Sequence, residues 1–194
     1  MTDIKRTVRG IGYDSKGTHK SYVNGVKSRS YQIWQNMLTR CYAESCRDRY
    51  YMYIGCTVVE EWQDYQNFAE WYTNHPYSGY GYNLDKDLLL KGNKVYSPET
   101  CCFVPPQINS LILDSRKSRG DYKQGVSLKK GSSKFRACLN VKGNCVELGY
   151  FETEEEAFRA YKQAKEKHVK ETAEEWKSKI DSNVYIALLN WEVN

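Results

Sequence analysis

Acidic and amide side chains near the middle of the chain have the types and spacing of a small metal site. Asp85 ends a short run that can form a strand, and a second apolar run covers residues 102–104. Pro105 and Pro106 then favour the start of a helix, which carries Asn109 on its first turns. A strand, a loop, a strand and a helix can fold back so that Asp85 and Asn109 face one site. Two hard oxygen donors of this kind suit a single Mg²⁺ that keeps several waters, so both residues are predicted magnesium ligands.

Two amphipathic helices are predicted ahead of this site. Apolar side chains recur at helical spacing after Ser30, a good helix-capping residue, and again from Trp62 to Tyr72. Pro76 ends the second of these helices. Residues 50–59 between them are rich in strand-forming residues. The two apolar stripes are predicted to form the core beside the metal site.

The stretch from residue 84 to 109 resembles the ββα-metal core of HNH nucleases, in the form found in bacteriophage homing endonucleases. It carries Asp85, a Ser97-Pro98-Glu99 turn that closes the loop, and Asn109 on the helix. The patterns Trp-x-x-Met-Leu-x-Arg-Cys-Tyr, Tyr-x-Gly-Cys and Phe-x-x-Trp before the core extend the resemblance to roughly residues 30–113. The resemblance implies an Mg²⁺, held by Asp85 and Asn109, that stabilises the charge on a DNA phosphate during cleavage.

Two positions depart from the family pattern. Lys86 stands where the family has its general-base His, and Thr100 stands where a structural Asn is common. A Lys between two aspartates is held protonated and is a poor base. His75, ten residues before Asp85, is a candidate substitute base, although a loop His without such a role is the simpler interpretation. The candidate catalytic residues are therefore Asp85, Lys86, Asn109 and His75.

Three short antiparallel strands are predicted at 125–129, 134–141 and 145–151, where apolar and polar residues alternate. Thr153 and Glu156 then form a capping box for a helix whose apolar stripe covers one face of the sheet. The other face is polar and basic, and a ribbon of this kind can enter a major groove and read base edges. The predicted contact residues are Lys123, Ser127, Lys129, Lys134, Arg136, Cys138, Asn140 and Glu147.

This half of the chain resembles the DNA-binding domain of plant APETALA-type (ethylene-response) factors, which also occurs fused to phage HNH nucleases. The resemblance rests on Gly125-Val126, Lys134-Phe135, Leu148-Gly149-Tyr150-Phe151 and the Glu155-Glu156-Ala157 stretch of the helix. It implies double-stranded DNA as the partner, bound in the major groove through residues 122–151. Several Arg and Trp contacts of the plant domains are absent, so the DNA sequence that is read must differ, with Arg136 as a substitute contact. A sheet-helix domain that binds protein is the alternative.

These predictions describe an α+β chain in which an HNH-like domain with flanking helices precedes a three-stranded sheet packed on one helix. Arg116, Lys117 and Arg119 in the linker are predicted to contact backbone phosphates. The N-terminal segment is either a basic arm on phosphates or a flexible tail, and the apolar run 184–191 either docks on a domain or forms a homodimer. The predicted parts are the arm at 1–29, the HNH-like domain at 30–113, the linker at 114–121, the APETALA-type domain at 122–176 and a short C-terminal helix within 177–194.

Composition and charge narrow the class of protein. Hydrophobic residues make up 40% and charged residues 27%, which is typical of a globular protein, and the net charge is +5. The absence of a long apolar run or a signal-like N-terminus predicts a cytoplasmic protein without a membrane span. Its seven cysteines contain no Cys-x-x-Cys pair, so reduced thiols are expected. Zinc is disfavoured because its best ligands, Cys41, Cys46, Cys56 and Cys101, are irregularly spaced.

Two functions share the predicted DNA binding. The first is a site-specific, Mg²⁺-dependent endonuclease of the homing type, for which nicking of one strand suits a single active site. The second is a transcriptional repressor that keeps the homing-endonuclease scaffold without its chemistry and binds DNA, either as a single chain or as a dimer. Lys86 favours the second function, whereas Asp85 and Asn109 favour the first.

Overall fold

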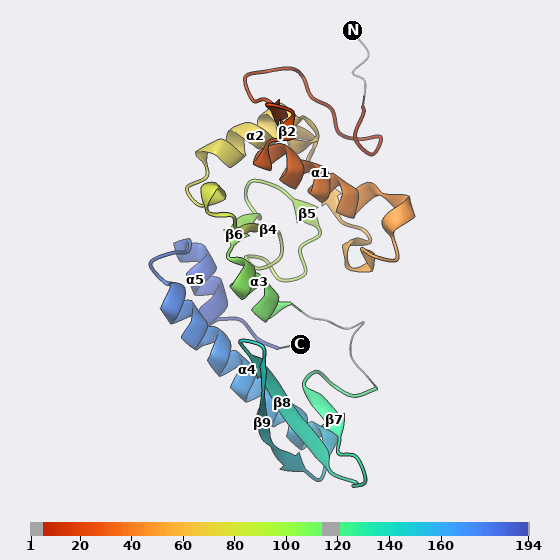
Figure 1. Ribbon diagram of the computed structural model, residues 1–194, viewed down its shortest axis with the longest axis vertical. Coiled ribbons are helices and arrows are strands. Elements are labelled where there is room, and N and C mark those ends of the chain that lie inside the picture. The colour runs from red at the N-terminus through yellow and green to blue at the C-terminus, as the bar shows by residue number, and fades with distance from the viewer. Residues whose placement is uncertain (1–5, 114–120, 194) are drawn as a thin grey trace. The chain divides into compact units, whose positions relative to one another are not determined.

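The computed structural model describes residues 6–113 and 121–193, and the chain divides into two compact units, Met1–Pro105 and Pro106–Asn194 (Figure 1). Helices and small sheets occur in both units, which confirms the predicted α+β class. The division falls just before the helix that was predicted to complete the HNH-like domain. Most of the predicted linker, residues 114–120, lies outside the described residues.

The first unit combines two α-helices with pairs of very short strands. Strand β1 pairs with β2 and β4 pairs with β6, both antiparallel, whereas β3 and β5 are parallel. Helix α1 packs against α2 to form the core. The elements are β1 (Tyr22–Val23), β2 (Val26–Lys27), α1 (Arg29–Tyr42), β3 (Thr57–Val58), α2 (Tyr65–Asn74), β4 (Asn83–Asp85), β5 (Val95–Tyr96) and β6 (Cys102–Val104).

Helix α1 is capped by Ser28, and the prediction of Ser30 was wrong. The hydroxyl of Ser28 accepts a 3.3 Å hydrogen bond from the backbone N of Tyr31. Ser30 lies inside the helix, where its hydroxyl contacts the Tyr65 hydroxyl at 2.9 Å. Both serines suit a cap by type, and the β1–β2 hairpin decides between them because it ends directly before Ser28.

Residues 50–59 contain less strand than predicted. Tyr51–Tyr53 is a single 3₁₀ turn, and only Thr57–Val58 is a strand. Gly55 has a φ of 78°, a left-handed conformation that turns the chain and interrupts any extended run. The strand propensity of this stretch is therefore overridden by the turn at Gly55.

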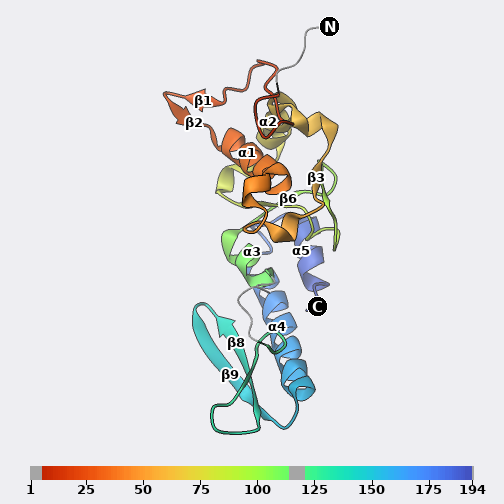
Figure 2. The same ribbon diagram turned by 90° about the vertical axis from the view of Figure 1, so that its right-hand side faces the viewer.

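The second unit contains the predicted three-stranded antiparallel sheet, in the order β7-β8-β9. Figure 2 shows the sheet and α4 as two layers. Ala137 and Leu139 of β8 are buried beneath the helix, together with Tyr161 of α4. No helix in the described ranges is both long and apolar enough to cross a membrane. The elements are α3 (Pro106–Ile112), β7 (Val126–Leu128), β8 (Phe135–Val141), β9 (Asn144–Phe151), α4 (Glu154–Trp176) and α5 (Ser182–Leu189).

Helix α4 begins at the predicted capping box. The Thr153 hydroxyl accepts a hydrogen bond from the backbone N of Glu156, and the Glu156 carboxylate accepts one from the backbone N of Thr153, both at 3.2 Å. Three glutamates occupy the first turn, where the positive end of the helix dipole favours them. The helix start is thus fixed by local sequence alone.

The C-terminal helix docks inside the second unit. Val184 and Leu188 of α5 are buried, and α5 packs on α4. Val193 then joins Leu139 and Tyr161 in the core between sheet and helix. Ile186, on the other side of α5, stays 53% exposed. The main apolar contacts of the 184–191 run are therefore made within one chain.

Gly125→Ala is expected to destabilise the second unit far more than Gly131→Ala. Both glycines have left-handed φ values, 75° and 73°, so each Ala costs about 1 kcal/mol of backbone strain. A Cβ at Gly125 would also overlap the Tyr161 ring, whereas a Cβ at Gly131 meets open space. Overpacking adds about 2 kcal/mol at the first position only. Urea unfolding followed by circular dichroism measures the difference, and equal losses would contradict the Gly125–Tyr161 contact.

Candidate nucleic-acid interface and metal site

Asp85 lies at the end of β4, where the chain leaves the β4–β6 pair. Its Oδ1 accepts hydrogen bonds from the backbone N of Asp87 (3.0 Å) and of Leu88 (2.8 Å), which forms the turn that starts the next loop. Burial raises the pKa of Asp85, and the charge of Asp87 raises it further. The charged form of Asp85 is therefore disfavoured in this environment, and a bound divalent cation would stabilise it.

Lys86 is a structural cation in this arrangement. Its side chain is only 5% exposed, and its Nζ donates to Asp87 Oδ2 at 2.9 Å and to the backbone O of Asn93 at 2.8 Å. Burial opposes the charged form, but the hydrogen bond and charge of Asp87 outweigh it and raise the pKa of Lys86. A lysine held in this way stays protonated and clamps the two ends of the loop between β4 and β5.

The same loop is closed by an amide and a hydroxyl group. The Asn93 Nδ2 donates to the backbone O of Lys86 and of Val95, both at 2.7 Å. The Thr100 hydroxyl donates to the Val95 carbonyl at 3.0 Å and contacts the Ser97 hydroxyl at 3.0 Å. Thr100 therefore makes loop-closing bonds at the position where a structural Asn was expected.

A second cation, Arg40, shares the Tyr53 ring with Lys86. The Arg40 guanidinium lies 5.2 Å from the Tyr53 ring centroid and 5.6 Å from that of Tyr96, and the Lys86 Nζ lies 5.8 Å from the Tyr53 centroid. The Arg40 Nε is buried without a hydrogen-bond partner among the described residues. Arg40 and Lys86 thus place two positive charges around the Tyr53 ring.

Three of the four cysteines considered as zinc ligands, Cys41, Cys56 and Cys101, have side chains that the structure describes. Cys56 and Cys101 are buried and Cys41 is partly buried. Burial raises the pKa of Cys41 and of Cys101 to about 12, so the thiolates that zinc needs are scarce. Within residues 6–113 and 121–193 there is no group of three or more His, Cys, Asp or Glu residues placed to hold a metal ion.

Asn109, the second predicted magnesium ligand, lies on α3. The succession of strand, loop, strand and helix agrees with the prediction, since β4, β6 and α3 follow one another along the chain. Asp85 belongs to the first unit and Asn109 to the second. Asn109 is partly buried on α3, which packs against α4. Magnesium binding by Asp85 and Asn109 stays a prediction.

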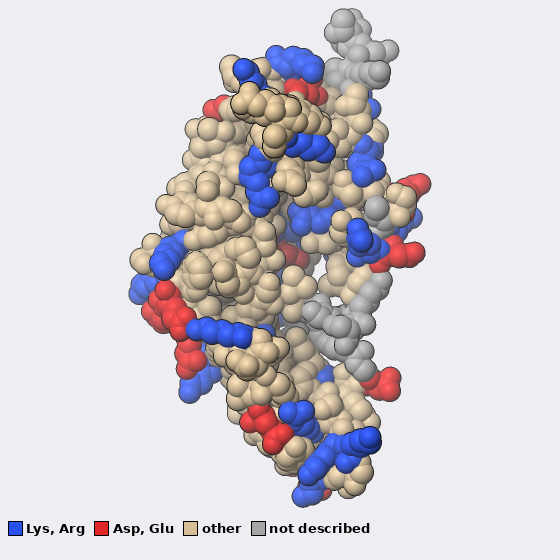
Figure 3. All heavy atoms as spheres, in the orientation of Figure 1, with Lys and Arg blue, Asp and Glu red and all other residues tan. Residues whose placement is uncertain are grey.

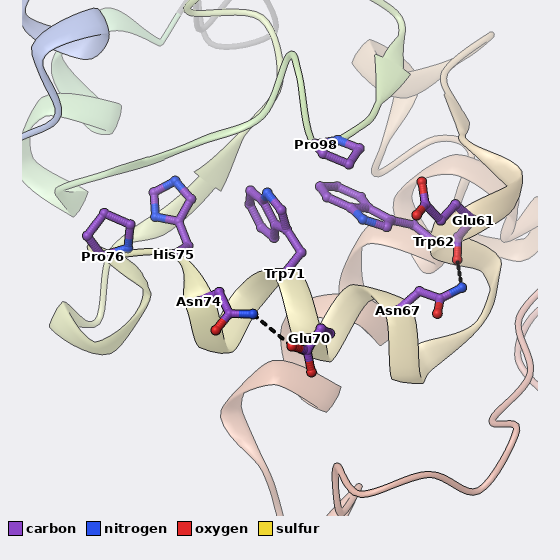
Figure 4. Close-up of a pocket in the computed structure, with 9 residues that line it drawn as sticks. All are labelled: Glu61, Trp62, Asn67, Glu70, Trp71, Asn74, His75, Pro76 and Pro98. Carbon is purple, nitrogen blue, oxygen red and sulfur yellow. Dashed lines mark hydrogen bonds between the residues drawn. The ribbon is translucent and has the colours of Figure 1, made fainter.

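His75 lies in a shallow, open pocket of about 430 Å³ beside α2 (Figure 4). Its ring lies 5.0 Å from that of Trp71 and 4.8 Å from that of Phe103. Phe103 is paired with Leu84, so the two share a sheet face, and Asp85 points to the opposite face. The structure therefore does not bring His75 and Asp85 together.

The pocket that contains His75 is acidic and aromatic. Glu70 holds one carboxylate oxygen 2.8 Å from His19 Nε2 and the other 2.8 Å from Asn74 Nδ2. None of the lining residues is Lys or Arg, so this surface does not suit a phosphate. The lining residues are Glu61, Trp62, Asn67, Glu70, Trp71, Asn74, His75, Pro76 and Pro98.

The exposed face of β7–β9 carries a connected polar network. Ser127, Arg136 and Tyr150 lie directly opposite one another across the three strands. Arg136 Nε donates to Glu147 Oε2 at 2.9 Å, and the Tyr150 hydroxyl donates to the same oxygen at 2.7 Å. These contacts lower the pKa of Glu147, the Tyr150 bond most and Arg136 next. These hydrogen bonds hold the Arg136 guanidinium in place on the exposed face of the sheet.

Three more predicted residues belong to this face. Lys129 lies over the Tyr150 ring, with its Nζ 4.4 Å from the centroid. Asn140 lies directly opposite Cys145, and its Oδ1 accepts from the backbone N of Gly143 in the turn. Cys138 forms a disulfide with Cys145, so the expectation of reduced thiols was wrong for this pair. The two cysteines are brought together because both project from this face of adjacent strands.

Two predicted contact residues are paired with other parts of the unit. Lys134 forms a 2.7 Å ion pair with Glu152. Lys123 forms a 3.0 Å ion pair with Glu155 and lies over the ring of Phe158. Phe158 belongs to α4 and packs against the core on the covered side of the sheet. Figure 3 shows acidic and basic atoms side by side over this part of the molecule. Arg116, Lys117 and Arg119 lie outside the described residues.

The basic N-terminal segment keeps its charge uncompensated in its observed contacts. Arg6 donates to a backbone oxygen and a glutamine amide, Arg9 to the Thr39 hydroxyl, and Lys27 to the Gln35 amide. All these acceptors are neutral, and all three cations are exposed. This segment therefore offers more free positive charge than the sheet face does.

Comparison with known protein families, with curated proteins and with solved structures found no match to this chain. The likeness to HNH and APETALA-type domains rests on the residue patterns alone.

Sequence reasoning missed several partners that decide how the sites work. Asp87 and Asn93 hold Lys86, and neither was among the predicted site residues. Tyr150 joins the polar face because a β-bulge shifts the register between Ala137 and Cys138, opposite Gly149 and Glu147. Gly149, with a φ of 136°, was the available signal for that bulge.

Asp85→Asn is expected to stabilise the protein at neutral pH. An Asn Oδ1 can accept the same two backbone bonds, and the substitution removes a charge whose folded pKa is raised. A raised folded pKa means that the native state holds the proton more tightly, so Asp85 lowers stability as the pH rises above its unfolded pKa of about 4. The gain should be present at pH 7 and absent near pH 3, as measured by urea unfolding.

Asp87→Asn is the matched control for this test. It removes the ion pair with the buried Lys86, so it should destabilise the protein at pH 7. A loss of stability at pH 7 for Asp85→Asn as well would show that the Asp85 carboxylate is itself needed for the fold.

Proposed function

We propose that the chain is a double-stranded DNA-binding protein that contacts its target through the exposed face of β7, β8 and β9. The observation that carries this proposal is that the two sides of the sheet differ: one is covered by a helix and the other is exposed and polar. One side is used by α4, and the other presents Lys129, Arg136, Asn140 and Glu147 on a continuous antiparallel ladder. The likeness to APETALA-type domains supports the same face.

The side chains on this face match the chemistry of base edges in a major groove. An Arg fork binds the O6 and N7 of guanine, an Asn amide binds the N6 and N7 of adenine, and a carboxylate accepts from the N4 of cytosine. Arg136, Asn140 and Glu147 supply these three groups in adjacent positions. Lys129 and the free cations Arg6, Arg9 and Lys27 suit backbone phosphates.

Between the two functions that share DNA binding, the geometry favours a regulator over a nuclease. Lys86 is clamped by Asp87 and Asn93, and His75 lies on the other face from Asp85. Neither of the two candidate bases, Lys86 and His75, is thus placed to act beside Asp85. A repressor that binds a two-fold site as a dimer would need a surface on each copy, and Ile186 is the exposed apolar residue of α5.

An Mg²⁺-dependent endonuclease remains the second candidate, and one observation favours it. The order of β4, loop, β6 and α3 is that of a ββα-metal core, with Asp85 and Asn109 at the expected positions. Asp85 and Asn109 would hold Mg²⁺ with waters, and the cation would stabilise charge on a cleaved phosphate. A metal-bound water would then have to act without the usual histidine.

Arg136→Ala is expected to weaken binding to the selected DNA site about tenfold, because it removes one bidentate base contact. The chain's preferred site is first selected from a pool of random duplexes, and Kd is then measured by fluorescence anisotropy. Lys129→Ala should weaken binding to all duplexes alike and lower the salt slope by about 1.

Lys170→Ala is the matched control, since Lys170 is exposed on α4 away from the sheet face. It should leave both affinity and salt slope unchanged. If Lys170→Ala lowered affinity as much as Arg136→Ala does, binding would depend on net charge and not on the sheet face.

Supercoiled plasmid carrying the selected site should be bound but not nicked by the protein in Mg²⁺ or Mn²⁺, because Lys86 cannot deprotonate water. Gel analysis of the plasmid topology gives the readout, with Asp85→Ala and Asn109→Ala run beside the native chain. Metal-dependent nicking that disappears in both variants would instead establish the endonuclease.

A further inference from the structure

Cys138 and Cys145 form a disulfide across the exposed face that we propose reads DNA. They lie on adjacent strands, with their Cα atoms 6.1 Å apart, a separation that a disulfide spans without moving the backbone. Cys145 is exposed and Cys138 is partly buried, so reductants in solution can reach the pair. The cross-link encloses the Lys142-Gly143 turn and joins the two strands that carry Arg136, Asn140 and Glu147.

This pair is the reactive thiol site among the described cysteines. Cys56, Cys101 and Cys102 are buried, and Cys41 is partly buried. Burial raises the pKa of Cys41 and of Cys101 to about 12, which leaves almost no thiolate to react. Among the cysteines whose side chains are described, this pair on the sheet face is therefore the one that oxidants and reductants reach most readily.

One sulfur of the pair touches Arg136, the residue to which the proposed function assigns a base contact. Arg136 Nη2 donates to Cys145 Sγ at 3.3 Å, while its Nε donates to Glu147. In the disulfide this sulfur is neutral and a weak acceptor. Reduction cleaves the S–S bond and frees the Cys145 side chain to turn, so the sulfur that Arg136 Nη2 contacts is no longer held in place. The turn at residues 142–143 also loses its covalent constraint.

We propose that Cys138 and Cys145 form a reversible redox site that sets DNA affinity, with the disulfide as the tight-binding form. This inference rests on the proposed DNA-binding function. Glutathione disulfide is a sufficient oxidant: the two thiols lose two electrons and two protons, one S–S bond forms, and glutathione disulfide is cleaved to two glutathione molecules. The disulfide raises affinity because it fixes the Cys145 sulfur beside Arg136 and keeps β8 and β9 in the shape that binds.

The test measures DNA binding of one protein preparation in buffers of defined ratio of reduced to oxidised glutathione. Thiol alkylation and mass spectrometry give the fraction of Cys138–Cys145 disulfide at each ratio. Affinity for the selected duplex should follow that fraction and fall about fivefold on full reduction. The double variant Cys138→Ser/Cys145→Ser should bind like the reduced protein at every ratio.

Each other outcome overturns the inference in a distinguishable way. Equal affinity of fully oxidised and fully reduced protein, or tighter binding by the reduced form, refutes control by the disulfide while leaving DNA binding intact. A redox response that persists in the double variant assigns it to other cysteines. Absence of binding in both forms refutes the proposed function, and with it any control of affinity. Alkylation of both cysteines at every ratio shows that the disulfide does not form.

Discussion

The second unit depends on one close contact, the packing of the Tyr161 ring of α4 against the backbone at Gly125. Only a residue without a Cβ allows this approach. The left-handed φ of Gly125 also sets the direction in which the chain enters β7. The contact fixes which face of the sheet meets the helix, since Ala137 and Leu139 must point to the same side. The polar face is exposed as a direct consequence, so a packing constraint on one side determines the surface available for recognition on the other.

Lys86 shows how structural and catalytic demands on one position conflict. A general base must be deprotonated and free to approach water, whereas a clamp must stay charged and fully bonded. Lys86 meets the second requirement through Asp87 and the Asn93 carbonyl, and Arg40 adds a second buried cation over the same Tyr53 ring. These bonds join the start of the loop between β4 and β5 to its end. The contacts of Lys86 therefore account for the shape of this loop without giving Lys86 a chemical role.

Local signals predicted the second unit well because its pattern is self-contained. The capping box at Thr153 and the alternation along β8 depend only on nearby residues, and both are confirmed. Local sequence patterns predicted the structure wrongly where contacts with other segments determine it. The β1–β2 hairpin selects Ser28 over Ser30 as the helix cap, and the bulge before Gly149 changes which residues of β9 face outward. The sites were harder still, because the partners of Lys86 and Arg136 follow from tertiary neighbours and from no spacing in the sequence.

If the sheet face binds DNA as proposed, its charges affect the choice of DNA sequence more than the strength of binding. Arg136 is balanced by Glu147 on this face, and the other predicted contact residues Lys134 and Lys123 pair with Glu152 and Glu155, so these basic residues contribute less positive charge than their number indicates. Paired charges attract a duplex weakly but penalise wrong bases, since each pair must be exchanged for a matching base edge. In the proposed DNA binding, nonspecific attraction would come from cations without an acidic partner, which in the described part of the chain are Lys129 on this face and Arg6, Arg9 and Lys27 in the N-terminal segment. The paired charges would then decide which sequence is bound, and the unpaired cations how strongly any duplex is attracted.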